Sequence, residues 1–328
     1  MWSSVPSTRR RLPLACSVVL LLALGACTAA PAPTTAASPT TRPTSSAAPS
    51  AGDASAPVNA GPAIAALGAE NFYADLIGQI GGPRVNTASL LNDPNADPHE
   101  FEASPKAAAA VADAKLVVVN GIGYDDFMQK LLGASTKPDR VVINVQELLG
   151  LKADVNAHVW YEPATMPRVA DAVTAALSKL DPQNAAYFAA QKAKYLAAFN
   201  PINDKIAQLK AKYTGAPVAF TEPVAEYLTE AIGLKVLTPP GFQEAIEQGT
   251  EPSPADVAAE RDLLTGKKVK VLLYNSQVTS PLTQGIQDLA RQSGIPVVGV
   301  AETIPPSFKT FQEWMLGQLS ELEQALGK

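Results

Sequence analysis

Short apolar runs alternate with longer amphipathic segments from about residue 62 to the end of the chain, and this alternation restricts the possible folds more than any other feature. The short runs suit buried strands, whereas the segments between them carry apolar residues at helical spacing. Strands that alternate with helices build parallel sheets covered by helices. The sequence therefore predicts an α/β fold. The expected strands occupy residues 63–67, 84–90, 116–120, 140–145, 217–221, 235–238, 269–274 and 296–300.

The two halves of this pattern resemble one another. Residues 70–81 align without gaps with residues 222–233, and in both segments an acidic residue ends a strand, a helix follows and a glycine ends the helix. A Ser-Pro pair, typical of a helix start, precedes the third strand of each half, at Ser104 and Ser253. A length of 328 residues suffices for about two domains. We therefore expect two related lobes, each a small parallel sheet wrapped by helices.

A segment rich in Ala, Lys and Gln separates the two halves. It covers residues 183–213 and predicts a long helix, which Pro201 should kink or interrupt. The predicted organisation is an N-terminal lobe at 59–182, this linking helix, and a C-terminal lobe at 214–328. Because a long helical connection restricts the separation of two lobes, we expect no wide hinge motion.

The N-terminus carries the pattern of an export signal. Three arginines at 9–11 precede an apolar run at 12–24, which is shorter than the about 20 residues that span a bilayer and fits a signal peptide. The sequence Leu24-Gly25-Ala26-Cys27 resembles the bacterial lipobox, in which the cysteine is lipidated and becomes the mature N-terminus. We expect a lipoprotein signal peptide at 1–26 and an exported protein, lipid-anchored through Cys27 to the outer face of the cytoplasmic membrane. The alternative is an ordinary secretory signal in which Cys27 is incidental.

The segment that follows, residues 27–58, consists almost entirely of Thr, Ala, Pro and Ser, with Arg42 and Asp53 as its only charges. Such a segment buries too little apolar surface to offset its ordering entropy. We expect a disordered tether between the anchor and the lobes.

Composition excludes several classes of function. The net charge is −5 and no block of basic residues is present, which argues against a nucleic-acid partner. Cys16 and Cys27 are the only cysteines, so disulfide frameworks, cysteine-based zinc sites and iron–sulfur clusters are excluded.

The candidate binding residues lie where strands end. The only two histidines, His99 and His158, follow the second and fourth expected strands. Glu222 and Glu302 follow the first and fourth strands of the second half. Ligands in open α/β sheets bind beyond the carboxyl ends of the strands. Two imidazoles and two carboxylates that meet between the lobes would bind and neutralise a divalent cation.

Three further polar residues also follow strands. Asn120 and Asn275 are candidates for hydrogen-bonding the metal ligands from outside, with simple loop polarity as the alternative. Glu70, the counterpart of Glu222 in the first half, is expected to complement the dipole of the helix that follows it.

Four short motifs surround the candidate ligands. They are Asp97-Pro98-His99, Asn156-Ala157-His158-Val159-Trp160, Thr221-Glu222-Pro223 and Val300-Ala301-Glu302-Thr303. Together they resemble the ligand motifs of the zinc/manganese solute-binding lipoproteins of bacterial metal ABC importers, the metal receptors with a helical backbone. The likeness extends from about residue 60 to the C-terminus, and it implies a metal held between the lobes. The implied ligands are His99, His158, Glu222 and Glu302.

The sequence departs from that family at two positions. Ala157 stands where proline is common, and Glu162 stands where aspartate usually precedes the proline. Neither residue is a proposed ligand.

The resemblance implies a receptor that captures one divalent transition metal as cargo and delivers it to a permease driven by a cytosolic ATPase, without catalysis. We expect a monomer. Zinc-specific members often have histidine at the third ligand position and a histidine-rich loop, whereas this chain has Glu222 and no such loop. Two carboxylates suit Mn²⁺ or Fe²⁺, although intrinsic affinity favours zinc over manganese. We therefore expect Mn²⁺, with Zn²⁺ close behind.

Two other classes of function remain open from the sequence. The same four residues could serve a secreted metal-dependent hydrolase, although catalytic zinc usually has three protein ligands and an open position for water. A two-lobed receptor for an organic ligand, such as a siderophore or corrinoid, would have an aromatic or arginine-lined cleft, and the aromatic content of this chain is low.

Overall fold

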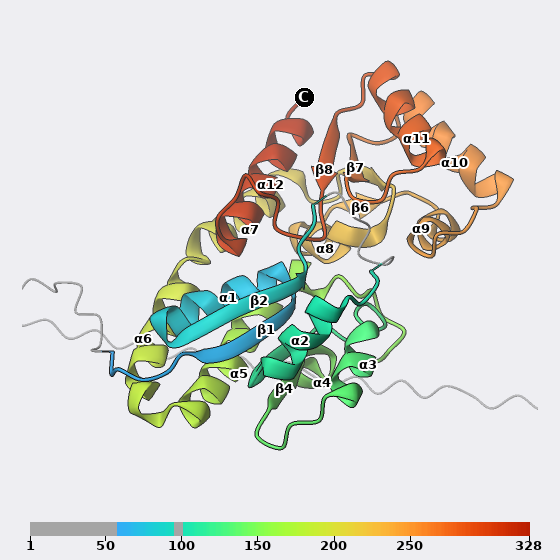
Figure 1. Cartoon of the computed structure of the whole chain (residues 1–328). Helices are drawn as coiled ribbons and strands as arrows, with labels where there is room; N and C mark the ends of the chain where they lie inside the picture. The colour runs from blue at the N-terminus through green and yellow to red at the C-terminus, as the bar shows by residue number, and fades with distance from the viewer. Residues whose placement is uncertain (1–57, 95–100) are drawn as a thin grey trace, which may run out of the picture. The chain divides into compact units, whose positions relative to one another are not determined.

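Two parallel sheets form the framework of the protein (Figure 1). The structure is a computed structural model that describes residues 58–94 and 101–328. Each sheet has four strands, in the orders β2-β1-β3-β4 and β6-β5-β7-β8. The second order repeats the first, shifted by four strands, as expected for two related lobes. The predicted α/β fold is confirmed. The predicted signal peptide, Cys27 and almost all of the predicted tether lie outside the described residues.

The first lobe contains four strands and five α-helices. Its strands are β1 (Ile64–Glu70), β2 (Val85–Leu91), β3 (Leu116–Val119) and β4 (Val141–Asn144). Its helices are α1 (Asn71–Gly81), α2 (Pro105–Asp113), α3 (Phe127–Ala134), α4 (Val145–Leu149) and α5 (Thr165–Leu180). β1 extends beyond the predicted strand because Glu70 still pairs with Leu91 on β2.

The second lobe repeats this plan. Its strands are β5 (Pro217–Phe220), β6 (Lys235–Val236), β7 (Val271–Asn275) and β8 (Val297–Val300). Its helices are α8 (Glu226–Ile232), α9 (Pro240–Glu247), α10 (Pro254–Thr265), α11 (Pro281–Gln292) and α12 (Phe311–Leu326). The predicted Ser-Pro helix starts are confirmed, since the hydroxyls of Ser104 and Ser253 each accept a backbone N–H three residues on, both at 3.1 Å.

Two helices, and not one, occupy the predicted linking segment. They are α6 (Ala185–Ala197) and α7 (Asn200–Tyr213). The predicted interruption at Pro201 is confirmed, and Pro201 lies in the first turn of α7, where its missing N–H leaves no helical hydrogen bond unmade. Among the described helices, none combines the length and the apolar character that a membrane crossing requires.

A row of polar residues on α1 fastens the first lobe to the second. Asn71, Asp75 and Gln79 are one turn apart on the same face of the helix. The Asn71 side chain accepts from the amide of Ile304 at 2.8 Å and donates to its carbonyl at 3.1 Å. Asp75 accepts from the amide of Phe311 at 2.9 Å, and Gln79 is hydrogen-bonded to a side chain of α12. The apolar core is likewise continuous across the two lobes.

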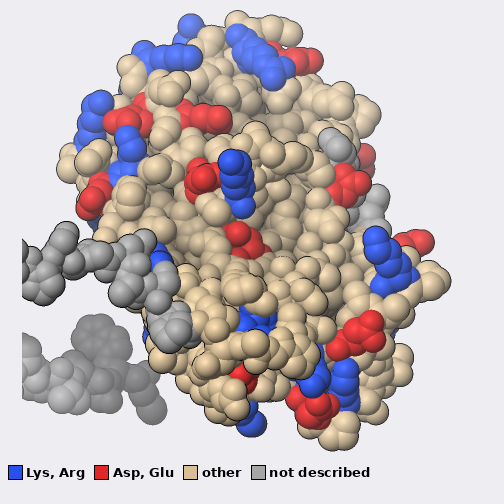
Figure 2. All heavy atoms as spheres, turned by 60° about the vertical axis from the view of Figure 1, so that its left-hand side comes forward, with Lys and Arg blue, Asp and Glu red and all other residues tan. Residues whose placement is uncertain are grey.

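The surface carries charges of both signs. On the face in Figure 2, lysines and arginines lie among aspartates and glutamates. One such pair joins α7 to α12, with Lys205 Nζ at 2.8 Å from Glu323 Oε2. Half-buried surface pairs such as this one add little to stability, about 0 to 1 kcal/mol, so the buried core and the α1 row hold the lobes together.

The buried carboxyl group of Glu260 makes the free energy of unfolding depend on pH. Glu260 on α10 is fully buried, which raises its pKa from 4.5 to about 7, with the Thr238 hydroxyl opposing the rise. The folded protein therefore binds more protons than the unfolded chain between about pH 4.5 and 7, and the free energy of unfolding falls as the pH rises through that range. Since one pKa unit corresponds to about 1.4 kcal/mol, ionised Glu260 costs about 3 kcal/mol. Glu260→Gln should stabilise the metal-free protein by about 2 to 3 kcal/mol at pH 8 and have little effect at pH 4.5.

Urea unfolding at the two pH values measures this difference. Glu251→Gln, the same change at an exposed position, is the control and should alter neither value. An equal effect of Glu260→Gln at both pH values would contradict the assignment of the buried charge.

Candidate metal centre

The candidate ligands that the structure describes are all buried, and two of them follow the ends of strands. Glu222 follows β5 and Glu302 follows β8, whereas His158 lies beyond β4, after α4 and a loop. Each is 0% exposed. His99 lies outside the described residues. The predicted strand-end positions therefore hold for Glu222 and Glu302, whereas His158 lies on a loop that follows α4.

These three side chains converge from the two lobes. His158 Nε2 lies 3.2 Å from Oε2 of Glu302. Asn275, at the end of β7, donates from one nitrogen to Glu222 Oε2 at 2.8 Å and to Glu302 Oε1 at 2.7 Å. Asn275 thus holds the two carboxylates side by side, opposite the imidazole.

Asn156 determines which nitrogen of His158 faces Glu302. The Asn156 side-chain nitrogen points to two acceptors, the Pro223 carbonyl at 2.7 Å and Glu226 Oε2 at 2.8 Å, so its oxygen faces His158. That oxygen accepts the His158 amide at 2.9 Å and lies 2.7 Å from Nδ1, which therefore carries the ring proton. Nε2 is therefore the ring nitrogen on the side of the Glu302 carboxylate, at 3.2 Å from Oε2.

The loop that carries Glu302 is fixed from both lobes. Gln277 of the second lobe accepts the amides of Glu302 and Thr303 on its side-chain oxygen, at 2.6 and 2.9 Å. From the first lobe, the Tyr124 hydroxyl donates to Glu302 Oε2 at 2.9 Å and the Tyr161 hydroxyl donates to the Ala301 carbonyl at 2.8 Å. These contacts fix the orientation of the Glu302 carboxylate.

A strained turn brings Tyr124 to this position. Gly121, Ile122 and Gly123 all have positive φ, of 76°, 58° and 76°. For a β-branched residue such as Ile122 this conformation is costly, and strain of this kind gathers at functional sites. Burial and the neighbouring Glu302 charge raise the pKa of Tyr124 well above its usual value, so the hydroxyl stays a donor.

Asn120 acts on the His158 loop instead of a described ligand. Its side chain donates to the carbonyl of Ala157 at 2.9 Å and accepts from the Tyr73 hydroxyl at 2.8 Å. The expectation that Asn120 hydrogen-bonds a ligand is thus replaced by a contact one residue before His158. Asn275 does contact two candidate ligands.

The expectation for Glu70 is wrong. Its side chain makes no hydrogen bond to the start of α1 and is fully buried, facing Asp125. Burial and the Asp125 carboxylate raise the pKa of Glu70 well above its usual value. The helix dipole favours an ionised acid, and burial outweighs it here.

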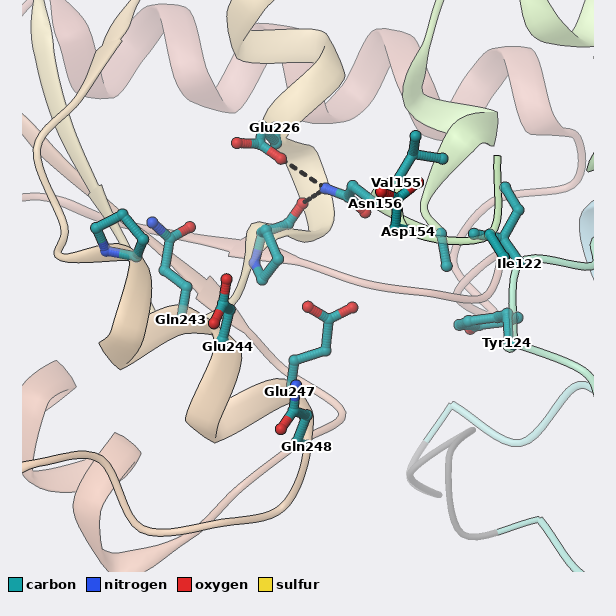
Figure 3. A pocket seen from close by; sticks show the side chains of 15 residues that line it. Ile122, Tyr124, Asp154, Val155, Asn156, Glu226, Gln243, Glu244, Glu247 and Gln248 are labelled. Atoms are coloured by element: carbon teal, nitrogen blue, oxygen red, sulfur yellow. Dashed lines mark hydrogen bonds between the residues drawn. The ribbon is translucent and has the colours of Figure 1, made fainter. Parts of the chain in front are cut away.

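A pocket of about 590 Å³ opens beside the site, between the 153–157 loop and α9 (Figure 3). Four acids contribute to its lining: Asp154, Glu226, Glu244 and Glu247. Glu247 Oε1 lies 3.8 Å from His158 Nδ1, so one acid of the pocket lining lies next to the buried imidazole. An acidic wall of this kind attracts cations.

Within residues 58–94 and 101–328, no three His, Cys, Asp or Glu side chains are arranged to hold a metal ion by themselves. The described part of the candidate centre is one imidazole and two carboxylates, and the expected fourth ligand is His99.

Comparison with known proteins identifies the family. The family model described as "Zinc-uptake complex component A periplasmic" matches residues 69–325, most of the chain. The chain belongs to this family. The family resemblance inferred from the four motifs is thereby confirmed, and its members are metal-binding solute receptors.

Three relatives show how far the similarity extends. The high-affinity zinc uptake system protein ZnuA of Bacillus subtilis is 24% identical over 256 residues, 72% of this chain and 77% of that protein. The manganese-binding lipoprotein MntA of Halalkalibacterium halodurans is 20% identical over 240 residues, 71% of this chain and 77% of that protein. The structure of the periplasmic zinc binding protein TroA from Treponema pallidum shares the fold, with a TM-score of 0.69 at 17% identity, covering 81% of this chain and 99% of that one.

Sequence reasoning missed three residues around this site. Tyr124 is signalled only by the two glycines before it, and Asn156 lies two residues before His158, inside a motif that was noted for its histidine. Gln277 lies two residues beyond Asn275. Their roles depend on contacts between distant segments, which no spacing in the chain reveals.

Proposed function

We propose that the protein is the extracytoplasmic solute-binding component of an ABC importer. It captures one divalent transition metal ion, Mn²⁺ or Zn²⁺, between its lobes and delivers it to a membrane permease that a cytosolic ATPase drives. The ligands are His158, Glu222, Glu302 and His99. The protein binds and releases its cargo and catalyses no reaction.

One observation carries this proposal. His158 Nε2 lies 3.2 Å from the Glu302 carboxylate in a fully buried site, and the other ring nitrogen contacts Asn156. Two adjacent carboxylates, held by Asn275, bring two negative charges to the same place. Imidazole nitrogens and carboxylate oxygens are ligands of divalent transition metals, and two carboxylates neutralise the charge of one such ion.

The types of ligand atom in the proposed site influence which metal ion it prefers. Two carboxylate oxygens harden the site and favour Mn²⁺ or Fe²⁺ more than a site built of imidazoles alone would. The relatives include one protein named for zinc and one named for manganese. We propose Mn²⁺ as the cargo, with Zn²⁺ as its nearest competitor.

The proposed location follows from the N-terminal sequence. Cleavage before Cys27 and lipidation of that cysteine would anchor a monomeric receptor to the outer face of the cytoplasmic membrane, close to its permease. The segment at 27–58 would be the tether.

Parallel calorimetric titrations with Mn²⁺ and Zn²⁺ test the function. The exported protein, stripped with chelator, should bind one equivalent of metal tightly, and His158→Ala and Glu222→Ala should each remove that binding because they take one ligand from each lobe. The ratio of the two affinities gives the intrinsic preference. Absence of binding to the wild type, or binding that neither variant changes, would refute a metal receptor and favour an organic ligand.

A further inference from the structure

The Asn156 side chain contacts both His158 and the turn that follows Glu222. Its carboxamide oxygen accepts from the His158 amide and from the ring Nδ1–H, at 2.9 and 2.7 Å. Its nitrogen crosses to the second lobe and donates to the carbonyl of Pro223, the residue after Glu222, at 2.7 Å. Figure 3 shows the nitrogen side of this arrangement, with Asn156 pointing to Glu226.

Further bonds reinforce the second-lobe side. Asn156 Nδ2 also donates to Glu226 Oε2 at 2.8 Å, and the Tyr227 hydroxyl donates to the Asn156 backbone carbonyl at 2.9 Å. Pro223, Glu226 and Tyr227 all belong to the short stretch that begins directly after Glu222. Asn156 of the first lobe is therefore hydrogen-bonded to the segment of the second lobe that directly follows the candidate ligand Glu222.

We propose that Asn156 is a positioning residue that holds His158 in the Nδ1–H tautomer and couples the imidazole to the Glu222 turn across the lobe interface. This inference rests on the proposed function, because it assigns a regulating contact to the same metal centre. If the Glu222 turn moves, the Asn156 side-chain nitrogen moves with it, because it is hydrogen-bonded to Pro223. The side-chain oxygen of Asn156 is hydrogen-bonded to the imidazole, so the ring is displaced as well. The spacing of the lobes and the orientation of a ligand are thereby linked through one planar group.

The chemistry of an amide makes this link specific. A side-chain amide has a nitrogen that only donates and an oxygen that only accepts. In Asn156 the nitrogen donates to the Pro223 carbonyl and the Glu226 carboxylate, and the oxygen accepts from His158. Aspartate in its place keeps an acceptor for His158 but sets a carboxylate oxygen against the Pro223 carbonyl and the Glu226 carboxylate. Alanine removes both ends. The two substitutions therefore separate the two sides of the contact.

The tautomer can be observed without any metal. The chain has only two histidines, so a long-range ¹H–¹⁵N spectrum of ¹⁵N-labelled, chelator-stripped protein contains two imidazoles, which His158→Ala assigns. In this spectrum, His158 of the wild type should show the Nδ1–H tautomer, because Nδ1 lies 2.7 Å from the Asn156 side-chain oxygen. Asn156→Ala should populate Nε2–H, and Asn156→Asp should restore Nδ1–H. Retention of Nδ1–H in Asn156→Ala would overturn the proposal, whatever the protein binds.

Metal affinity tests the coupling across the interface. Asn156→Ala should weaken binding of Mn²⁺ and Zn²⁺ by about 10- to 100-fold, as for other residues that orient a metal ligand. The double variant Glu226→Ala/Tyr227→Phe should weaken binding less and keep the Nδ1–H tautomer. Adding these two changes to Asn156→Ala should cause no further loss beyond about twofold, because both act through Asn156.

Losses that simply add would overturn the coupling, since the residues would then act independently. A wild type that binds neither metal would refute the proposed function, and the tautomer spectra would still decide the role of Asn156. The two failures are therefore distinguishable.

Discussion

Replacing Glu302 by glutamine is expected to abolish tight metal binding while the fold stays intact. Glu302 accepts hydrogen bonds from Asn275 and Tyr124 and faces His158 Nε2 at 3.2 Å. Glutamine keeps the size of the side chain but removes a negative charge and a carboxylate ligand. Because losses outside the ligand set already cost about 10- to 100-fold in metal affinity, the loss here should exceed about 100-fold for both Mn²⁺ and Zn²⁺, measured by calorimetry.

Glu321→Gln is the matched control for this variant. It makes the same change of charge at an exposed position on α12 and should bind metal like the wild type. Unchanged affinity in Glu302→Gln, with an unchanged circular dichroism spectrum, would exclude Glu302 as a ligand.

Replacing Asn275 by alanine is expected to destabilise the protein mainly when metal is absent. Asn275 is fully buried and donates to Glu222 and Glu302, while its oxygen accepts the Gln277 amide at 3.0 Å. In Asn275→Ala, the buried carboxylates of Glu222 and Glu302 lose the hydrogen-bond donor that they share. An unsatisfied buried group costs about 1 to 3 kcal/mol and more when charged, so a loss of about 3 kcal/mol is expected in chelator. A bound cation replaces the missing donor and should recover most of that loss.

Urea unfolding with chelator and with saturating Mn²⁺ provides the comparison. Asn203→Ala, at an exposed position of α7, should have little effect in either condition. If Asn275→Ala lost the same stability with and without metal, Asn275 would be an ordinary core residue with no link to the cargo.

The fold could be predicted from the sequence because each strand is a local signal. Leu116–Val119 is four apolar residues in a row, all buried, and the Ser-Pro helix starts satisfy their own backbone groups. The ends of elements were less predictable where pairing decides them. Glu70 remains in β1 because it pairs with Leu91, a residue far along the chain.

The positions of two candidate ligands could be predicted, but the contacts that support them could not. Glu222 and Glu302 were singled out because ligands bind beyond strand ends in parallel sheets, and both follow strands in the structure, whereas His158 lies after α4 and a loop. The contacts of Tyr124 and Asn156 reach 178 and 70 residues along the chain, so no local pattern encodes them. Glu70 shows the reverse error, because its place before a helix suggested a charge near a dipole, whereas tertiary packing buries it.

The row of bonds along α1 gives the two edges of the lobe interface different mechanical properties. Asn71, Asp75 and Gln79 span about 12 Å along the helix axis, since each residue rises 1.5 Å, and all three bond to the second lobe. Hydrogen bonds arranged along one helix axis oppose sliding and separation of the two lobes. They oppose small rotations of one lobe about that axis much less. We therefore expect any movement of the lobes during exchange of the cargo to be a small rotation about the axis of α1.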